Sequence, residues 1–454
     1  MPYVLGIHLG ATATTAALAR RDGGQWAAAA PVPLAGGPVV PTVLCKVQDG
    51  SFVAGEAARR QEISHHEWVA RGFTRRLGED APLLVGREFV SAQRLVATMV
   101  EWVADAVANR QGHPPEHIAV AHSATWGPHR VHLVHQALAQ LGLTDVTMLP
   151  EPMAVALDYA AKQRVAEHDA IVVANIGGSS FDATVLRRRE SGFEVVGSPL
   201  NSEHPSGQDL DDEIFAAVRA EFGDALDALD LSDLTQRAAL AQLRAECVRA
   251  KEVLSHQPGV QIRVELPGLR TEFALSRARY EQLTRPHLER VPELILQAVQ
   301  SASLTPEDVS AFVLAGGTAR TPLLRHLVAE RLQRPPLVDV APELAAASGA
   351  AAAAVQVVST DTDQSALAET SVLVRIEGPD EFDDAEADLP DAPRPPVEVE
   401  PLPLEPPDED RARLIKIIKL SVAAVLIIGG LLLTYLWPNA SIGGVLSAFQ
   451  HIRH

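Results

Sequence analysis

The fold is decided by the stretch Val172-Val173-Ala174-Asn175-Ile176-Gly177-Gly178-Ser179-Ser180-Phe181-Asp182. In it, an apolar run typical of a buried strand leads into a turn of small residues with polar residues at both ends. A matching stretch, Gly6-Ile7-His8-Leu9-Gly10-Ala11-Thr12-Ala13-Thr14-Thr15, follows the first apolar run about 165 residues earlier. Small residues in a tight turn let backbone amides approach an anion closely. Two such turns predict two related lobes that hold one phosphate chain between them.

A third Gly-rich turn completes the pattern. The stretch Val313-Leu314-Ala315-Gly316-Gly317-Thr318-Ala319-Arg320-Thr321-Pro322 is typical of a strand, a Gly-Gly turn and the start of a helix. Such a turn lets the main chain pack against a flat ligand such as a nucleoside. The candidate ligand-binding residues of the three turns are Gly10, Ala11, Thr12, Thr14, Gly177, Gly178, Ser179, Ser180, Gly316, Gly317 and Thr318.

The rest of the N-terminal body is predicted to be α/β, because apolar runs alternate with helical periodicity up to about residue 358 of 454. Only two cysteines are present, which argues against a disulfide scaffold or a cysteine-rich metal site. The net charge of −19 argues against nucleic-acid binding, since phosphate contacts need basic clusters. Five lysines against 34 arginines fit a GC-rich bacterial genome. The clearest strands are predicted at 4–9, 117–121, 170–175, 193–197 and 311–314, and helices at 90–109, 130–141, 234–254 and 279–302.

The composition changes after residue 358. Residues 377–410 contain 14 Asp or Glu, nine Pro and one Arg, which leaves too little apolar area to fold. We therefore predict an extended, disordered, acidic Pro-rich linker over residues 359–413.

An uncharged run of 18 residues, Leu420–Trp437, follows the linker. It is long enough to cross most of a ~30 Å hydrocarbon core, so we predict one transmembrane helix over 414–437 and a short extracytoplasmic tail over 438–454. Four basic residues precede the run and Arg453 alone follows it. The positive-inside rule then predicts a single-pass membrane protein with its large N-terminal domain in the cytoplasm.

The order and spacing of the three turns resemble the nucleotide-binding domain of the DnaK-type heat-shock protein 70 chaperones, in the actin-like ATPase superfamily. Further segments are similar to that family, namely Pro41-Thr42, 53–58, 149–159, 206–211, 249–255, Pro342-Glu343 and 348–351. The resemblance covers about residues 3–357. It implies a bilobal fold, with two ribonuclease-H-like lobes (about 1–165 and 166–358) around a cleft that binds ATP or ADP. It also adds four nucleotide-binding positions, Gly207, Lys251, Ser255 and Glu343.

The departures from the family pattern concern the metal and the catalytic residues. Each of the first two loops carries an Asp in the family, and these positions are His8 and Asn175 here. The family's catalytic Lys aligns with Arg75. Replacing two carboxylates removes negative charge from a hard-cation site that prefers oxygen ligands, so Mg²⁺ binding is doubtful. The family's other carboxylates remain, as Glu151 and Asp182.

Three classes of function fit the sequence. The first is a membrane-anchored, nucleotide-binding regulatory or scaffolding module, a pseudo-chaperone with weak or no hydrolysis that acts on an unknown protein partner. The second is an active ATP-hydrolysing chaperone, which in the family continues into a peptide-gripping domain. The third is an interaction domain that keeps only the fold. We expect the first, because the phosphate loops are better preserved than the residues for hydrolysis.

Overall fold

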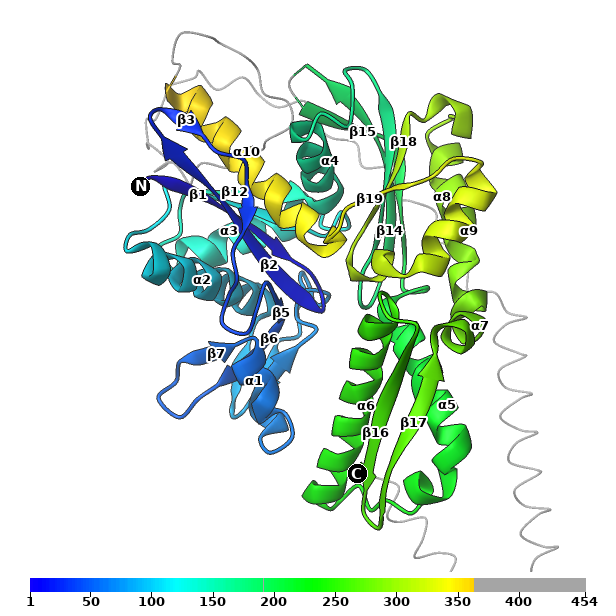
Figure 1. Cartoon of the computed structure of the whole chain (residues 1–454). Coiled ribbons are helices and arrows are strands. Elements are labelled where there is room, and N and C mark those ends of the chain that lie inside the picture. Colours follow the sequence, from blue (N-terminus) through cyan, green and yellow to red (C-terminus); the bar gives the residue numbers. More distant parts are fainter. Residues whose placement is uncertain (191, 363–454) are drawn as a thin grey trace, which may run out of the picture. The chain divides into compact units, whose positions relative to one another are not determined.

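Two mixed β-sheets repeat one strand order in the computed structural model, which describes residues 1–190 and 192–362 (Figure 1). The first sheet has the order β12-β11-β1-β2, with three short strands, β3 to β5, added along β2. In it β1 pairs antiparallel with β2 and parallel with β11. The strands of the first sheet are β1 Tyr3–Leu9, β2 Ala13–Asp22, β3 Gln25–Trp26, β4 Ala30–Pro31, β5 Val39–Pro41, β11 His117–His122 and β12 Val146–Pro150.

The second sheet has five strands in the order β15-β14-β13-β18-β19. Here β13 pairs antiparallel with β14 and parallel with β18, so β13 takes the place that β1 has in the first sheet. The two sheets therefore have the same strand pairing around β1 and β13, each of which leads into one of the two Gly-rich stretches. The strands are β13 Ala170–Ile176, β14 Phe181–Arg189, β15 Gly192–Ser202, β18 Ala311–Ala315 and β19 Leu337–Val338.

A pair of helices, α4 (Glu151–Ala161) and α10 (Ala345–Thr362), forms a layer between the two sheets. Helix α10 packs on α4 and on β1, β2 and β11, while α4 also touches β13, β14 and β15. The helices can approach this closely because Gly349 of α10 has no side chain. A Cβ at Gly349 would lie 1.7 Å from the carbonyl oxygen of Ala154. Sequence analysis assigned the last helix to the second lobe, whereas its packing joins it to the first.

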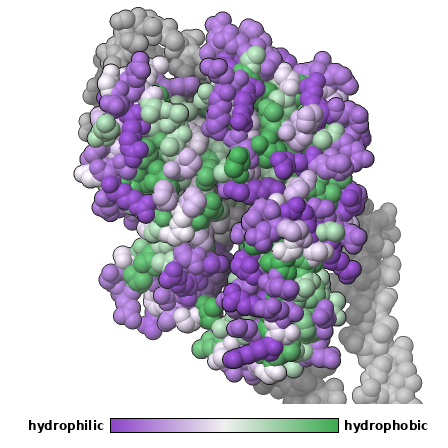
Figure 2. Space-filling view, viewed as in Figure 1, coloured by the Kyte–Doolittle hydropathy of each residue, from purple (hydrophilic) through white to green (hydrophobic). Residues whose placement is uncertain are grey.

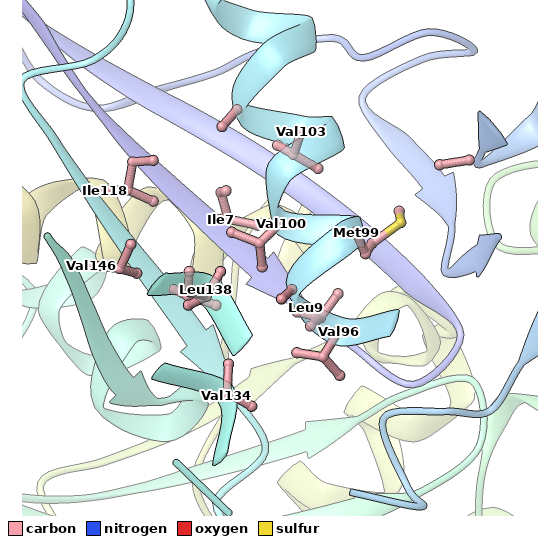
Figure 3. Close-up of a cluster of buried hydrophobic side chains, with 14 of the residues drawn as sticks. Ile7, Leu9, Val96, Met99, Val100, Val103, Ile118, Val134, Leu138 and Val146 are labelled. Carbon is pink, nitrogen blue, oxygen red and sulfur yellow. The ribbon is translucent and has the colours of Figure 1, made fainter. Parts of the chain in front are cut away.

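Strand alternation separates two hydrophobic cores in the first lobe. On β1 the odd-numbered residues from Tyr3 to Leu9 point toward α2 (Ala92–Gln111) and α3 (Pro128–Ala139). The even-numbered Val4 points toward the α4–α10 layer instead. Figure 3 shows the first of these cores, where Ile7 and Leu9 pack with Val96 and Val100 of α2 and with side chains of β11, β12 and α3. Both faces of the sheet are thus covered, which explains why β1 is a nearly continuous apolar run.

Each lobe also carries an outer part. In the first lobe it contains α1 (Glu56–Gln61), the three-stranded sheet β7-β6-β8 and the hairpin β9–β10. In the second it contains α5 (Gly207–Asp227), α6 (Leu234–Leu254), the hairpin β16–β17 and α7 (Arg277–Leu288). The short strands are β6 Val43–Lys46, β7 Phe52–Ala54, β8 Val69–Arg71, β9 Leu83–Val85, β10 Glu88–Val90, β16 Gly259–Leu266 and β17 Leu269–Ser276.

The single helix predicted at 279–302 is wrong, because the structure has two helices there. Residues 279–302 form two helices, α7 and α8 (Arg290–Ser301), which meet at Glu289. Pro292, the third residue of α8, has no amide hydrogen to donate to the carbonyl of Leu288, so one helical hydrogen bond is missing just after the two helices meet. Helix α8 packs against β13, β14 and β15, and α9 (Pro322–Leu332) lies beside it.

The surface turned to the viewer is mostly hydrophilic, and hydrophobic residues reach it in small patches (Figure 2). No helix within residues 1–190 and 192–362 has both the length and the apolar composition needed to cross a bilayer. The predicted helix at 414–437 and the tail at 438–454 lie outside these residues, as does the linker apart from its first residues. Those first residues, from 359, belong to α10, which continues to Thr362.

Candidate functional site

Strand alternation brings the polar residues of the two loops to facing surfaces. Because Ile7 and Leu9 point into the outer core of the first lobe, His8 between them points toward the α4–α10 layer. In the second lobe Ile176 likewise belongs to the outer core, so Asn175 points the opposite way. Asp182, which is the register partner of Asn175 on β14, shares its face of the sheet. Three of the predicted site residues are thereby placed on the inner faces of the two sheets.

His8 and Glu151 form an ion pair in which His8 Nε2 lies 2.9 Å from Glu151 Oε1. Glu151 is the first residue of α4, where the positive end of the helix dipole favours a carboxylate. Both side chains are largely buried. Burial lowers the pKa of His8, but the nearby Glu151 carboxylate raises it more, so the pKa lies above its ordinary value. The pair therefore favours an imidazolium at the position where the resemblance puts an aspartate.

The second loop has its own polar pair. The side-chain amide of Asn201 donates to Asp182 Oδ1 at 2.6 Å. Burial raises the pKa of Asp182 to about 6, and the nearby charge of Glu151 adds to this effect. Asn175 Oδ1 is buried and accepts no hydrogen bond within the described residues. Asn175 is thus uncharged. The Asp182 carboxylate is hydrogen-bonded and not fully ionised near neutral pH.

The two loops touch each other across the cleft. Each is a tight turn, closed by a hydrogen bond from the Gly10 amide to the Ala13 carbonyl (3.0 Å) and from the Gly177 amide to the Ser180 carbonyl (2.9 Å). A Cβ at Gly178 would lie 2.5 Å from the hydroxyl oxygen of Thr12. Glycine is therefore needed where the lobes meet.

Arg75 reaches this meeting point from the outer part of the first lobe, where it follows β8 in the chain. Its guanidinium donates to the carbonyl oxygen of Ser179 in the second loop. Sequence analysis put Arg75 at the position of the family's catalytic Lys, and the structure places it beside the second loop. No carboxylate forms an ion pair with Arg75 within the described residues, so its charge is available to an anionic ligand.

The third turn packs against the second loop. Gly316 has a positive φ of 83°, and a Cβ on it would lie 2.4 Å from the Ile176 carbonyl oxygen. The hydroxyl of Thr318 donates to the Gly177 carbonyl at 3.2 Å. Gly207, at the start of α5, donates its amide to the same carbonyl at 2.9 Å. The second and third turns and the N-terminus of α5 therefore form one connected corner.

Three of the four nucleotide-binding positions that the resemblance adds have side chains held by protein partners. Lys251 Nζ donates to the carbonyl of Gly207 (2.9 Å) and to Asp211 (2.8 Å). Ser255 donates to the Lys251 carbonyl at 3.4 Å. Glu343 pairs with Arg320, whose Nε donates to it at 2.9 Å. Lys251 and Gly207 thus lie together, while Glu343 lies beside the third turn.

A cavity of about 60 Å³ lies between the first loop, α4 and the third turn. Thr14 is absent from its lining, because it points into the outer core and pairs with the Thr42 hydroxyl at 2.9 Å. Its neighbour Thr15 lines the cavity instead, as the alternation along β2 requires. The lining residues are His8, Gly10, Thr12, Ala13, Thr15, Glu151, Val155, Ala315, Gly316, Gly317, Pro342, Glu343 and Ala346.

Sequence reasoning missed Thr15, although the period of two along the strand could have found it. It also missed Asn201, Asp211 and Arg320, whose pairing with Asp182, Lys251 and Glu343 depends on tertiary contacts with no local signal. A separate open groove of about 680 Å³ lies between α6, α7 and the β16–β17 hairpin. It shares no lining residue with the cavity between the loops.

Comparison with known proteins agrees with this geometry. The profile of the Hsp70 protein family matches residues 83–377, more than half of the chain. The chain belongs to the Hsp70 family. It is similar to the chaperone protein DnaK of Thermotoga petrophila, with 27% identity over 357 residues, which are 77% of this chain and 58% of that protein. The DnaK of Elusimicrobium minutum is 29% identical over 365 residues, covering 77% of this chain and 57% of the relative.

This Hsp70 chain thus spans little more than half the length of the DnaK proteins that it matches. Its mixed α/β architecture is consistent with the actin-like ATPase fold. Proteins of the Hsp70 family generally bind ATP and ADP. The matched region corresponds to a divergent nucleotide-binding domain.

Proposed function

We propose that this chain is a membrane-anchored Hsp70-type protein that binds ATP or ADP between its lobes, with weak or no hydrolysis. In this proposal the nucleotide is a conformational ligand that regulates or scaffolds a protein partner. The observation that carries the proposal is the convergence of the three glycine turns on one place, where two lobes meet. At the same place His8 and Asn175 stand in the positions of the family's aspartates.

The loops supply groups suited to a phosphate chain. Tight turns such as those at Gly10 and Gly177 present backbone amides to anions, and the Arg75 guanidinium adds a planar, permanently charged donor. Gly316 and Gly317 leave room beside the third turn for a flat base. These features support ATP or ADP as the ligand.

The size of the cavity supports a role for the nucleotide in conformational change. Ligand pockets usually enclose about 300 Å³ or more, whereas the space between the loops is about 60 Å³. A nucleotide that reaches the phosphate loops must therefore separate Thr12 from Gly178. Its binding free energy would be coupled to the relative position of the two lobes.

Weak hydrolysis follows from the electrostatics of the cleft. Phosphoryl transfer depends on positioning and on stabilising charge at the transferred group. His8 is engaged with Glu151, and Asn175 carries no charge. Losing one electrostatic group of this kind commonly lowers the rate about 10²–10³-fold. Because such groups act as a unit, further losses add less than their sum.

The test uses the full-length protein. Calorimetric titration with ATP and with ADP measures binding, and a single-turnover assay with γ-labelled ATP measures hydrolysis. We expect heat of binding and little release of phosphate. The double variant His8→Asp with Asn175→Asp should hydrolyse ATP faster. If the wild type already hydrolyses ATP at a rate that the double variant does not raise, the active chaperone ATPase replaces this proposal. An absence of nucleotide binding would leave the third hypothesis, an interaction domain.

Membrane attachment is the part of the proposal that depends on sequence alone. Its support is the uncharged run Leu420–Trp437 and the excess of basic residues before it. A reporter fused after His454 should behave as extracytoplasmic, and the protein should remain in the membrane pellet after carbonate washing. A cytoplasmic signal from the reporter would refute the orientation, and a soluble protein would refute the anchor.

A further inference from the structure

We infer that the open groove in the outer part of the second lobe is a docking site for an extended, acidic peptide segment of a protein partner. The groove, of about 680 Å³, lies between α6, α7 and the β16–β17 hairpin (Figure 1). It shares no lining residue with the cavity between the glycine turns, so this inference goes beyond the proposed function and does not depend on nucleotide binding. Its support comes from the lining of the groove, from the edge of β16 and from two arginines.

The groove has an apolar floor and one wall formed by α6. The floor contains Val260 and Leu275, which are register partners in the hairpin. Arg249 and Val253 are four residues apart, so both lie on the side of α6 that forms the wall. Gly259 has no side chain, which lets the main chain of a ligand approach the hairpin closely. An open groove with this lining can hold an extended chain through both its side chains and its main chain.

The β16 strand presents unpaired backbone groups along this groove, because it pairs with β17 alone among the described strands. Arg249 donates to the Gln261 carbonyl at 3.0 Å, so this carbonyl points away from β17. In antiparallel pairs the amide and the carbonyl of a residue point the same way, and this direction alternates along the strand. The amides of Gly259 and Gln261 are therefore directed away from β17, and both residues line the groove. An extended peptide can add to such an edge through main-chain hydrogen bonds.

Two arginines determine which side chains such a peptide should carry. Of the described residues that line the groove, Arg249 and Arg279 are charged and none is acidic. Arg249 is fixed beside the strand edge, because the Glu246 carboxylate accepts from its guanidinium at 2.7 Å. The exposed Arg279 side chain has no hydrogen bond or ion pair within residues 1–190 and 192–362. Since a guanidinium binds a carboxylate with two parallel hydrogen bonds, charge complementarity favours an acidic segment.

The test measures the binding of a fluorescein-labelled octapeptide, in which Glu and Val alternate, to the full-length protein by fluorescence anisotropy without nucleotide. Alternation places all the carboxylates on one side of an extended chain. We expect saturable binding. An octapeptide of alternating Lys and Val is the matched control and should bind at least about tenfold more weakly. The inference is overturned if the Glu-Val peptide shows no saturable binding up to about 1 mM, or if the Lys-Val peptide binds as tightly.

Variants at exposed positions locate the bound peptide without disturbing the core. Arg279→Glu should weaken binding about tenfold or more. Arg325→Glu, in α9 and outside the groove, changes the net charge equally and should bind as the wild type does. Ala274→Glu adds a carboxylate to the lining and should also weaken binding, whereas Ala274→Lys should not. Wild-type affinity in either Arg279→Glu or Ala274→Glu would mean that the peptide binds elsewhere, which would overturn the inference.

A labelled deoxythymidine octamer tests the other class of extended polyanion. It should bind more weakly than the Glu-Val peptide, because nucleic-acid affinity needs many phosphate contacts and the groove offers two arginines. Tighter binding of the octamer that is lost in Arg279→Glu would assign the groove to single-stranded nucleic acid and overturn the inference. Because all of these titrations omit ATP and ADP, a failure of nucleotide binding would refute the proposed function and leave this inference in place.

Discussion

His122 lies at the carboxyl end of β11, close to Glu151, and its imidazole is 2% exposed. The ring stacks on Trp126 with centroids 5.1 Å apart. Burial lowers the pKa of His122 to about 4, although the neighbouring carboxylate and a hydrogen bond to the Ser123 carbonyl oppose this. The side chain is therefore neutral at physiological pH. The two histidines thus have opposite pKa shifts, because His8 forms an ion pair with Glu151 and His122 does not.

The shift of His122 makes the folded state sensitive to acid. Since its folded pKa is below its unfolded value near 6.5, the unfolded chain binds the proton more tightly. Stability is then lost as pH falls from about 6.5 toward 4. We expect this residue to account for about 2 kcal/mol of the free energy of unfolding lost between about pH 7.5 and pH 5. His122→Phe keeps an aromatic ring against Trp126 and should lose less free energy over this range in urea unfolding. An equal loss in the variant would contradict the assignment.

Asp182 is expected to show the opposite dependence. Its folded pKa of about 6 lies above the ordinary value of 3.8, because burial disfavours the charged form. Stability is therefore greatest at low pH and falls as pH rises through this interval. Asp182→Asn keeps an oxygen for the amide of Asn201 and removes the charge. The variant should be more stable than the wild type by about 2 kcal/mol near pH 7.5 and should match it near pH 4. A variant less stable than the wild type at neutral pH would show that the carboxylate is stabilising.

At the scale of elements, helices α4 and α10 can cross closely because the residue of α10 at the crossing is a glycine. The space above Gly349 is filled by the backbone of Ala154, and Gly6 of β1 meets the backbone of Ala347 and Ala351 in the same way. Gly349→Ala should lower the free energy of unfolding by about 3 kcal/mol or more, since backbone must move to admit the methyl group. The matched control is Gly223→Ala in α5, where a Cβ would meet nothing within 4 Å. The control should be neutral or stabilising by up to about 1 kcal/mol. Similar losses in both variants would mean that the close crossing is not what makes Gly349 necessary.

The elements also show how far sequence reasoning reaches. Continuous apolar runs predicted β1 and β13 because both faces of these strands are covered, and helical periodicity predicted α6 at its observed bounds, Leu234–Leu254. The same reasoning joined α7 and α8, since the periodicity continues across Glu289, where one helix ends and the next begins. It also selected Thr14 as a ligand-binding residue, whereas strand alternation places Thr15 in the wall of the cavity.

The arrangement of the cleft was harder to predict. Small-residue turns identified the loops, because their geometry is encoded locally. The contact of Arg75 with Ser179 and the pairing of His8 with Glu151 join residues far apart in the chain, so their partners become evident only from the folded sheets.

At the scale of the whole described body, the two lobes are joined at several levels. Asp339 after β19 accepts hydrogen bonds from Lys162 (2.7 Å) and from Arg164, which both follow α4. In addition, Arg75 contacts the Ser179 carbonyl in the second loop. Between the outer parts, Arg237 of α6 donates to the carbonyl of Ile63 at 3.4 Å. A nucleotide that separates the loops is expected to break the contacts of Arg75 and Arg237 with the opposite lobe. The ionic cluster at Asp339 is expected to persist and to act as the hinge.

The two native cysteines are buried, so this movement can be tested with engineered cysteines and a thiol reagent. Cys45 and Cys247 are 3% and 1% exposed. Burial raises the pKa of both thiols, that of Cys247 to about 12. Because the thiolate is the reactive form, neither should compete with an engineered, exposed pair. The double variant Ile63→Cys with Arg237→Cys places one thiol in each outer part, across the mouth of the cleft.

We expect a short bifunctional thiol reagent to link this pair readily without nucleotide and more slowly with saturating ATP or ADP. If the nucleotide shifts the equilibrium toward an open cleft by about 1.4 kcal/mol, the rate of cross-linking should fall about tenfold. The double variant Glu62→Cys with Arg71→Cys is the control, since these two side chains form an ion pair within the outer part of one lobe and the linking rate of the thiols should not respond to nucleotide. Faster linking of the first pair with nucleotide would show that binding closes the mouth of the cleft. An unchanged rate, together with measurable nucleotide binding, would show that the loops make room locally while the lobes stay in place.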